Sequence, residues 1–130
     1  MRAKWIVQIE GRDGKCTETS FEKTIDGSAA DREEQCHRMR RDVGRCLTES
    51  SLNELADGRQ EQRPHCCGRP MRRKGLRTRK VTALDGEIAV RRRRYRCADC
   101  GRECYPGDEQ ITCGRHGVTR PLAQRVCQLA

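Results

Sequence analysis

Large apolar side chains are scarce in this chain of 130 residues. Hydrophobic residues make up 34% of the sequence, and the aromatic ones are limited to Trp5, Phe21, Tyr95 and Tyr105. So little apolar material cannot build one substantial hydrophobic core. Domains commonly have about 100 to 150 residues, so a chain of this length does not hold a multidomain enzyme with separate substrate and cofactor halves.

Long hydrophobic runs are also missing. No apolar run approaches the roughly 20 residues of a transmembrane helix, and residues 1–6 lack the apolar stretch of a signal peptide. We therefore expect a cytoplasmic protein with no membrane partner. In such a reducing compartment, closely spaced cysteines bind metal more often than they form disulfides.

Cysteine and positive charge, in contrast, are abundant. The chain has 10 cysteines and 28 basic against 19 acidic residues, a formal net charge of +9. Residues 1–62 carry 11 basic and 13 acidic side chains, and residues 63–130 carry 17 and 6. The shift near residues 60–64 predicts a boundary between an ordinary N-terminal module and a C-terminal one that binds a polyanion.

The first module, residues 1–62, is expected to contain a β-hairpin followed by helices. Residues 5–9 have high β propensity, residues 11–14 favour a turn, and residues 17–24 are the expected partner strand. Ser28, with Asp31 three residues later, predicts a helix N-cap, and Ser51 predicts the start of a second, shorter helix that ends near Gly58.

Apolar side chains recur at helical spacing after the first of these caps, and we interpret them as core residues: Cys36, Met39, Val43, Cys46 and Leu47. Cys16 stands alone beside the hairpin turn and is expected to have no special role.

The second module, residues 63–108, carries two cysteine clusters. Cys97 and Cys100 form a C-x2-C pair followed by Gly101, and Cys66 and Cys67 precede Gly68. Two intervening residues let both thiolates turn toward one ion, and a glycine after the second cysteine accepts the positive φ of such a turn. We predict a structural zinc site with these four cysteines as ligands.

The first cluster leaves one ligand open. Two adjacent residues rarely both reach one ion, so His65 or Cys104 is possible in place of Cys66. Cys113 and His116 form a weaker pair, for which a polar loop is the preferred interpretation.

A second β-hairpin is expected between the cysteine clusters. Residues 76–83 and 87–96 have strand character and flank Asp85 and Gly86, a strong hairpin turn signal. Alternation places Ile88, Val90, Arg92 and Arg94 on one face of the second strand and Tyr95 on the other. Basic side chains line this hairpin and its approach, and we expect them to contact nucleic acid phosphates: Arg72, Arg73, Lys74, Arg77, Arg79, Lys80, Arg91, Arg92, Arg93 and Arg94.

The last segment, residues 109–130, is expected to be a loop followed by the start of a helix. Thr119 is a predicted cap with Pro121 in the first turn, and Leu122, Val126 and Leu129 share one face. The fold class expected for the whole chain is therefore α+β, with a strand and helix module, a zinc-ribbon hairpin and a short C-terminal helix.

The central part of the chain resembles a known family. It is similar to the N-terminal zinc-ribbon region of bacterial insertion-sequence transposases of the Kra type. The motifs that carry this resemblance are Cys67-Gly68-Arg69-Pro70-Met71, Arg94-Tyr95-Arg96-Cys97-Ala98-Asp99-Cys100-Gly101 and Tyr105-Pro106-Gly107-Asp108. Relatives offer two clear thiols in the first cluster, where this chain has an altered arrangement.

The resemblance implies a DNA-binding ribbon that helps to recognise transposon ends. In the family, a catalytic domain with the retroviral-integrase type of fold follows, and this chain has no counterpart of it, so we expect a truncated, non-catalytic protein without a small-molecule substrate. An RNA-binding zinc ribbon, or a fragment that regulates a full-length transposase by binding it, are the alternatives. A decaying transposase fragment also stays open.

Overall fold

The computed structural model describes residues 1–59, 63–113 and 117–129. Residues 60–62 of the boundary predicted near residues 60–64, and the candidate ligand His116, lie outside the described residues. In chain order the elements are β1 (Arg2–Glu10), β2 (Cys16–Thr24), α1 (Ala29–Arg59), β3 (His65–Cys66), β4 (Arg69–Pro70), β5 (Arg72–Ala83), β6 (Gly86–Arg96), β7 (Glu103–Cys104), α2 (Asp108–Ile111), β8 (Thr112–Cys113), β9 (Val118–Thr119) and α3 (Arg120–Leu129). The predicted α+β class is confirmed.

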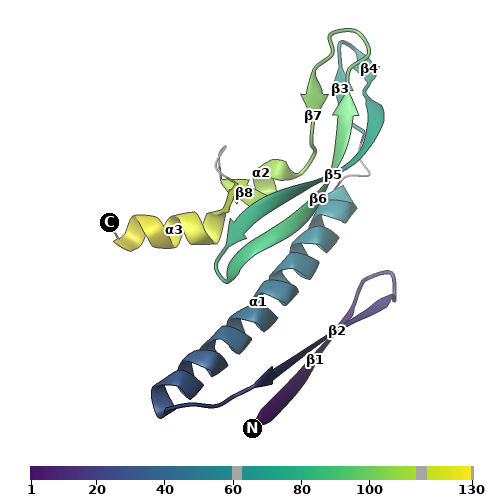
Figure 1. The fold of residues 1–130 in the computed structure, drawn as a ribbon. Helices are drawn as coiled ribbons and strands as arrows, with labels where there is room; N and C mark the ends of the chain where they lie inside the picture. The colour runs from purple at the N-terminus through teal and green to yellow at the C-terminus, as the bar shows by residue number, and fades with distance from the viewer. Residues whose placement is uncertain (60–62, 114–116, 130) are drawn as a thin grey trace.

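The predicted N-terminal hairpin is present as β1 and β2 (Figure 1). Trp5 lies directly opposite Phe21, and the two rings stack with their centroids 5.3 Å apart. At the open end of the hairpin, the terminal amino group of Met1 donates to the Ile25 carbonyl, and the Ile25 amide donates back to the Met1 carbonyl. The two strands form a sheet of their own.

A single long helix, α1, follows the hairpin. Its N-terminus is the predicted one, because the Ser28 hydroxyl accepts from the Asp31 amide while Asp31 accepts from the Ser28 amide. The prediction of a second helix starting at Ser51 is wrong, since α1 continues to Arg59. Ser51 lies in the helix interior, where no free amide remains for it to cap.

The core assignments for the first part of α1 are also wrong. Cys36 is exposed, Met39 and Cys46 are only half-buried, and Leu47 keeps 47% of its surface accessible. The buried residue of the described part of this helix is Ala56, near its C-terminal end. The C-terminal half of α1 packs against the central sheet, and the helix also contacts β1 (Figure 1).

The central sheet has five strands in the order β7-β6-β5-β9-β8. The predicted hairpin of β5 and β6 forms its centre, with Ala83 opposite Gly86 at the Asp85-Gly86 turn. Their register shifts between Arg73 and Leu76, where β5 has a bulge. β7 pairs with the far end of β6, and the parallel strand β9 pairs with β5 near the turn.

The main core lies between this sheet, α1 and α2. Val81, Ala83, Ile88 and Val90 of the hairpin are buried there. Ala56 of α1 and Ile111 of α2 complete this core, against which Leu52 packs. Residues from all three segments recognised in the sequence therefore share one core.

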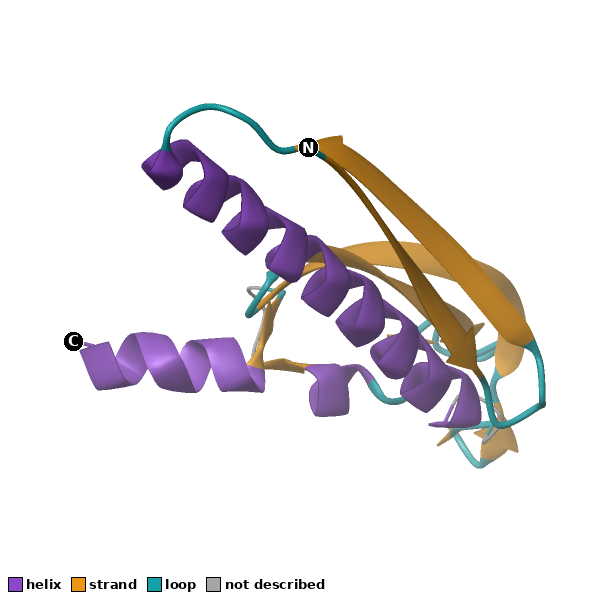
Figure 2. Ribbon diagram, turned by 90° about the horizontal axis from the view of Figure 1, so that it is seen from below, coloured by secondary structure: helices purple, strands orange, loops and turns teal. Residues whose placement is uncertain are grey.

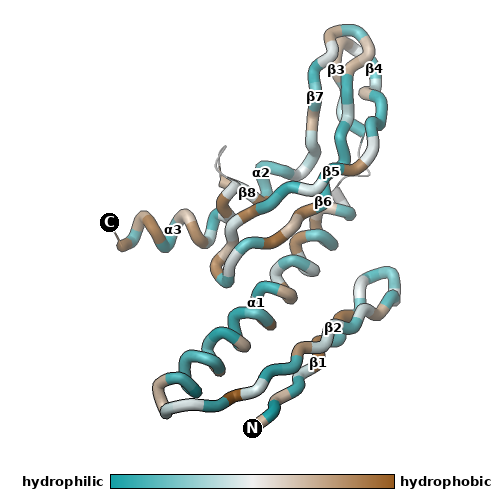
Figure 3. The backbone as a smooth tube through the Cα atoms, in the orientation of Figure 1, coloured by the Kyte–Doolittle hydropathy of each residue, from teal (hydrophilic) through white to brown (hydrophobic). Residues whose placement is uncertain are grey.

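A second, smaller cluster lies at the other end of the hairpin. Tyr95 is fully buried there with Met71 and Cys97, and Cys66 and Cys104 pack against them. The hydropathy colouring shows the brown segments of β5 and β6 where they cross α1, while the arm with β3, β4 and β7 is mostly teal and white (Figure 3). This small cluster is therefore the local support of the cysteine-bearing arm.

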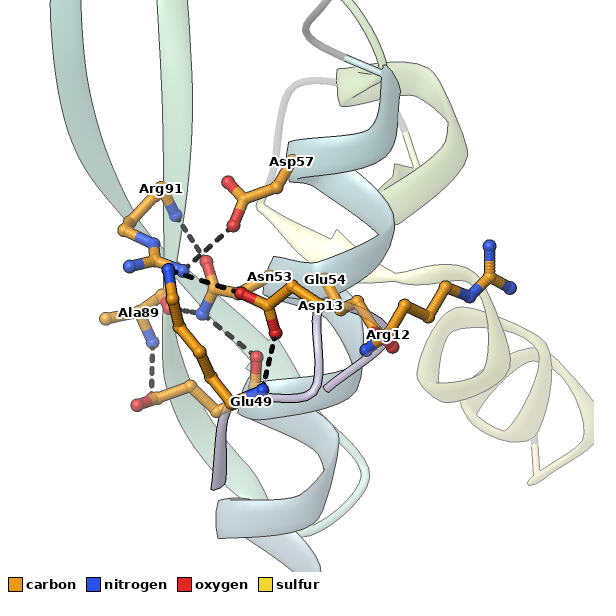
Figure 4. A network of polar contacts seen from close by, with 9 residues as sticks. Arg12, Asp13, Glu49, Asn53, Glu54, Asp57, Ala89 and Arg91 are labelled. Carbon is orange, nitrogen blue, oxygen red and sulfur yellow. Dashed lines mark hydrogen bonds and ion pairs between the residues drawn. The ribbon is translucent and has the colours of Figure 1, made fainter. Parts of the chain in front are cut away.

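Polar side chains of α1 complete the edge of β6 (Figure 4). The Ala89 amide donates to Glu49 at 2.9 Å, and the Ala89 carbonyl accepts from the side-chain amide of Asn53 at 2.9 Å. The Arg91 amide donates to Asn53 Oδ1 at 2.8 Å. Two side chains of the helix thus take the hydrogen bonds that a neighbouring strand would otherwise take.

The C-terminal segment contains more structure than the sequence predicted. α2, β8 and β9 precede α3, which begins at Arg120 with Pro121 in its first turn, as expected. α3 has no buried residue and projects from the sheet (Figure 2). Among the described residues, no helix is both long and apolar enough to cross a membrane.

Candidate metal centre

Four cysteines converge at the arm formed by β3, β4 and the end of β6. Cys66 and Cys67 come from the β3–β4 turn, and Cys97 and Cys100 follow β6 directly. Their sulfur atoms all lie within 4.8 Å of one another. The structure thus brings together the four cysteines named from the sequence and places them within reach of one metal ion.

The turn between β3 and β4 explains how two adjacent cysteines reach one point. Cys66 pairs with Arg69, so Cys67 and Gly68 are the two central turn residues. Their φ angles are 53° and 72°, the positive values of a type I′ hairpin turn. In an extended strand, neighbouring side chains point to opposite faces. The left-handed conformation of Cys67 removes this obstacle, and the Cys66 and Cys67 sulfurs lie 3.9 Å apart.

The second pair is held by a tight turn after β6. The Cys97 amide donates to the Arg102 carbonyl at 2.9 Å, and the Gly101 amide donates to the Cys97 carbonyl at 3.1 Å. Gly101 has a φ of 73°, as the sequence predicted for the glycine after the second cysteine. This turn directs the Cys100 sulfur to within 3.6 Å of that of Cys66.

The spacing of the sulfurs suits a tetrahedral ion. Thiolates bound to zinc at 2.3 Å in a tetrahedron are about 3.8 Å apart. The measured 3.6 Å between Cys66 and Cys100 and 3.9 Å between Cys66 and Cys67 bracket this value. Four sulfur ligands favour zinc or an iron–sulfur centre over the hard cations that prefer oxygen.

The thiols of the cluster differ in how readily they ionise. Backbone amides of Cys100 and Asp99 donate to the Cys97 sulfur and lower its pKa to about 7. Hydrogen bonding of the Cys67 thiol to Cys100 and to Cys66 raises the pKa of Cys67 to about 12. The pKa of Cys66 is raised as well, chiefly by its bond to Cys100. A cation at the centre would favour the thiolate forms of Cys66 and Cys67 and so lower these raised pKa values.

The two alternative ligands do not join the group. His65 is exposed on β3 and is not among the side chains that converge. Cys104 packs against Met71, Tyr95 and Cys97, and burial raises the pKa of its thiol. Within the described part of the chain, Cys104 is a half-buried residue of the arm, and the group of four converging sulfurs includes that of Cys66.

Basic side chains border the cysteines. Arg72, Lys74 and Arg96 line a pocket of about 420 Å³ together with residues 97–101. Arg72 lies directly opposite Arg96 across the hairpin. Arg96 was not among the residues singled out from the sequence, although its place beside Cys97 and at the end of the arginine run was a usable signal.

Several of the predicted phosphate-binding residues have partners within the protein. Asp108 accepts from Arg92 at 2.7 Å and from Arg79 at 3.4 Å, and the Arg92 guanidinium lies 4.0 Å from the centre of the Tyr105 ring. Arg94 lies 3.6 Å from Glu103, with 19% of its side chain exposed. These arginines fasten the segment after the metal centre to the hairpin.

The remaining basic residues divide between the two ends of the hairpin. Arg91 pairs with Asp57 and Lys80 with Glu87 in exposed ion pairs near α1 and the turn. Arg93 is half-buried opposite Leu76. Near the cysteine end, the exposed basic residues of β5 are Arg72, Arg73, Lys74 and Arg77. We call these four residues the β5 basic segment.

Comparison of the chain with protein-family models, with curated proteins and with solved structures found no match.

Proposed function

We propose that the chain is a zinc-ribbon protein that binds DNA through the β5 basic segment, and that its zinc is structural. The observation that carries this proposal is the convergence of four cysteine sulfurs within 4.8 Å beside an exposed row of basic side chains. DNA is preferred to RNA as the partner because of the resemblance to transposase zinc ribbons, and transposon ends are the expected site.

A structural role for zinc follows from the number of ligands. Four protein sulfurs fill a tetrahedron and leave no position for a water molecule or a substrate. A zinc of this kind would contribute folding energy to the arm, where the apolar support is only the small cluster around Tyr95. The proposed protein is therefore a binding module and not an enzyme.

The electrostatics support an anionic partner. A zinc ion with four thiolates has a net negative charge, and the adjacent Arg72, Lys74 and Arg96 offset it. Arg73 and Arg77 are exposed and do not line that pocket, so their charge is directed to solvent. Guanidinium groups match phosphate oxygens with paired hydrogen bonds.

Metal content tests the first half of the proposal. We expect purified protein to hold one zinc per chain by elemental analysis, and Cys97→Ser and Cys100→Ser to lose it. Cys36→Ser is the matched control, because Cys36 is exposed on α1 away from the cluster. A wild-type protein that is folded and free of metal after expression with zinc would overturn the zinc assignment.

Duplex binding tests the second half. We expect Arg73→Gln with Arg77→Gln to weaken binding and to reduce the slope of log K against log salt by about 2, since each phosphate contact contributes about 0.9. The control is Arg40→Gln with Arg41→Gln on α1, which removes the same charge from another exposed surface. Equal losses in both variants would indicate a net-charge effect and contradict a site on β5.

Competition separates the possible nucleic acids. Transposon-end duplex, scrambled duplex of the same length and structured RNA are compared as competitors at one salt concentration. Preference for the end sequence is the expected result. Stronger competition by the RNA would favour an RNA-binding ribbon.

A further inference from the structure

The outer edge of β1 is open. β1 pairs with β2 in a sheet of two strands, and no other strand of the described residues joins them. The edges of the β5–β6 hairpin, in contrast, are covered by β7 and β9 and by the side chains of α1. A sheet of two strands is only marginally stable alone, so a further strand would be favourable at an outer edge of this sheet, at β1 or at β2.

The hydrogen bonds at the two ends of the hairpin fix which backbone groups face this edge. Met1 and Ile25 exchange both backbone hydrogen bonds, and the Gly11 amide donates to the Lys15 carbonyl. Odd-numbered residues of β1 therefore direct their amides and carbonyls to β2. By the alternation of an antiparallel ladder, the even-numbered residues direct theirs to the open edge.

The even-numbered residues also share one exposed face of the hairpin. They are Arg2, Lys4, Ile6, Gln8 and Glu10, all accessible, and Ile6 keeps 52% of its surface exposed. The opposite face carries the half-buried side chains of Ala3, Trp5, Val7 and Ile9. β1 thus offers basic groups at its start, an exposed isoleucine at its centre and an acid at its end.

This order is complementary to itself when a second copy runs antiparallel. Centred on Ile6, the pairing sets Ile6 opposite Ile6, Lys4 opposite Gln8 and Arg2 opposite Glu10 of the other chain. β2 lacks this property, because the same operation centred on Ser20 sets Glu18 opposite Glu22 twice. Opposite charges stabilise directly facing pairs and like charges destabilise them.

We propose that two copies of the chain dimerise through antiparallel pairing of β1 with β1, centred on Ile6. Each facing pair exchanges both backbone hydrogen bonds, because the even-numbered residues already point them outward. The product is one sheet of four strands in the order β2-β1-β1-β2, related by a twofold axis. On its half-buried face, Trp5 of one copy lies opposite Val7 of the other and extends the apolar surface.

Sedimentation equilibrium of the full chain under reducing conditions tests the dimer. We expect the average mass to rise with concentration from 14.9 kDa toward twice that value. Ile6→Pro removes the central edge amide and spares the β2 ladder, so it should give a monomer. Ser20→Pro is the matched control, since it removes the equivalent amide from the outer edge of β2 and should leave the dimer intact.

Charge reversal gives a second readout that a folding defect would not reproduce. Glu10→Arg faces Arg2 of the other copy in two places and should weaken the dimer about tenfold. Adding Arg2→Glu should restore the dimer, because the two facing positions again carry opposite charges. The Arg2–Glu22 ion pair at 3.1 Å is lost equally in monomer and dimer, so its loss does not affect this comparison. A chain that stays monomeric, equal effects of the two proline variants, or no rescue would each overturn the proposal.

Discussion

Among the described residues other than glycine, Cys67 alone has a positive φ, and it lies in the candidate metal centre. The left-handed conformation costs an ordinary residue roughly 1–2 kcal/mol. Such strain persists where the surroundings enforce it, often at functional sites. The β3–β4 turn enforces it here, and the sulfur joins the cluster as a result.

Replacement of Cys67 by glycine should therefore have opposite effects with and without metal. When a chelator has removed the metal, Cys67→Gly is expected to raise the free energy of unfolding by about 1 kcal/mol, because glycine adopts this φ without strain. With zinc present, the variant should be less stable than the wild type, because a ligand is lost. Thermal melts under both conditions provide the measurement, and equal shifts in both would show that Cys67 is not a ligand.

Acid should weaken metal binding most steeply below neutral pH. Cys67, with its pKa raised to about 12, holds a proton that the metal must displace throughout the working range. Cys97, with its pKa lowered to about 7, is mostly ionised above pH 7 and protonated below it. For each proton that the metal must displace, the metal affinity falls about tenfold for every unit by which the pH is lowered. Cys97 therefore adds to this pH dependence only below pH 7.

A competition titration with a chromophoric chelator at pH 8, 7 and 6 measures this slope. The expected result is a larger fall in affinity between pH 7 and 6 than between pH 8 and 7. Cys104→Ser should keep the same profile, because Cys104 lies outside the four-cysteine group. An affinity that does not depend on pH would contradict thiolate ligation.

At the scale of elements, α1 shows how tertiary contacts decide what a local pattern means. Ser51-Leu52-Asn53-Glu54 has the form of a capping box, and it predicted a helix start. In the structure, Leu52 packs on the main core and Asn53 binds the edge of β6, so the helix runs through both. The sequence contains no signal for these contacts, because their partners lie more than 30 residues away.

Asn53→Ala should detach this part of α1 from β6. The change leaves the Ala89 carbonyl and the Arg91 amide without their partner, at a cost of about 2 kcal/mol for one partly buried and one exposed hydrogen bond. Ser51→Ala, on the exposed side of the same turn, is the control and should change stability by less than about 0.5 kcal/mol. Urea unfolding compares them, and similar midpoints would mean that the network is unimportant.

The elements that local chemistry determines were predictable. Both hairpins carried turn signals, the Ser28 cap was explicit, and the cysteine clusters had recognisable spacing. Tyr95 belongs to a different buried cluster from Ile88 and Val90, and its burial depends on Met71 and the cysteine arm. The short strands β8 and β9 were missed because β9 forms by pairing with distant β5, and β8 then pairs with β9.

At the scale of the whole molecule, two cores share one hairpin. The main core joins α1, α2 and the turn end of β5 and β6, and the small cluster around Tyr95 lies with the cysteines at the other end. Only the second lies in direct contact with the candidate ligands Cys66 and Cys97. Metal should therefore govern the stability of one end far more than the other.

Hydrogen exchange with and without a chelator tests this division. Removing metal should speed exchange of the amides of Met71 and Cys97, which bond across the arm to Pro64 and Arg102. Val81 and Ile88, paired in the ladder near the turn, should keep their protection because α1 still covers them. Uniform loss of protection would instead show that the chain unfolds as one cooperative unit. The stability of both small apolar cores would then depend on metal.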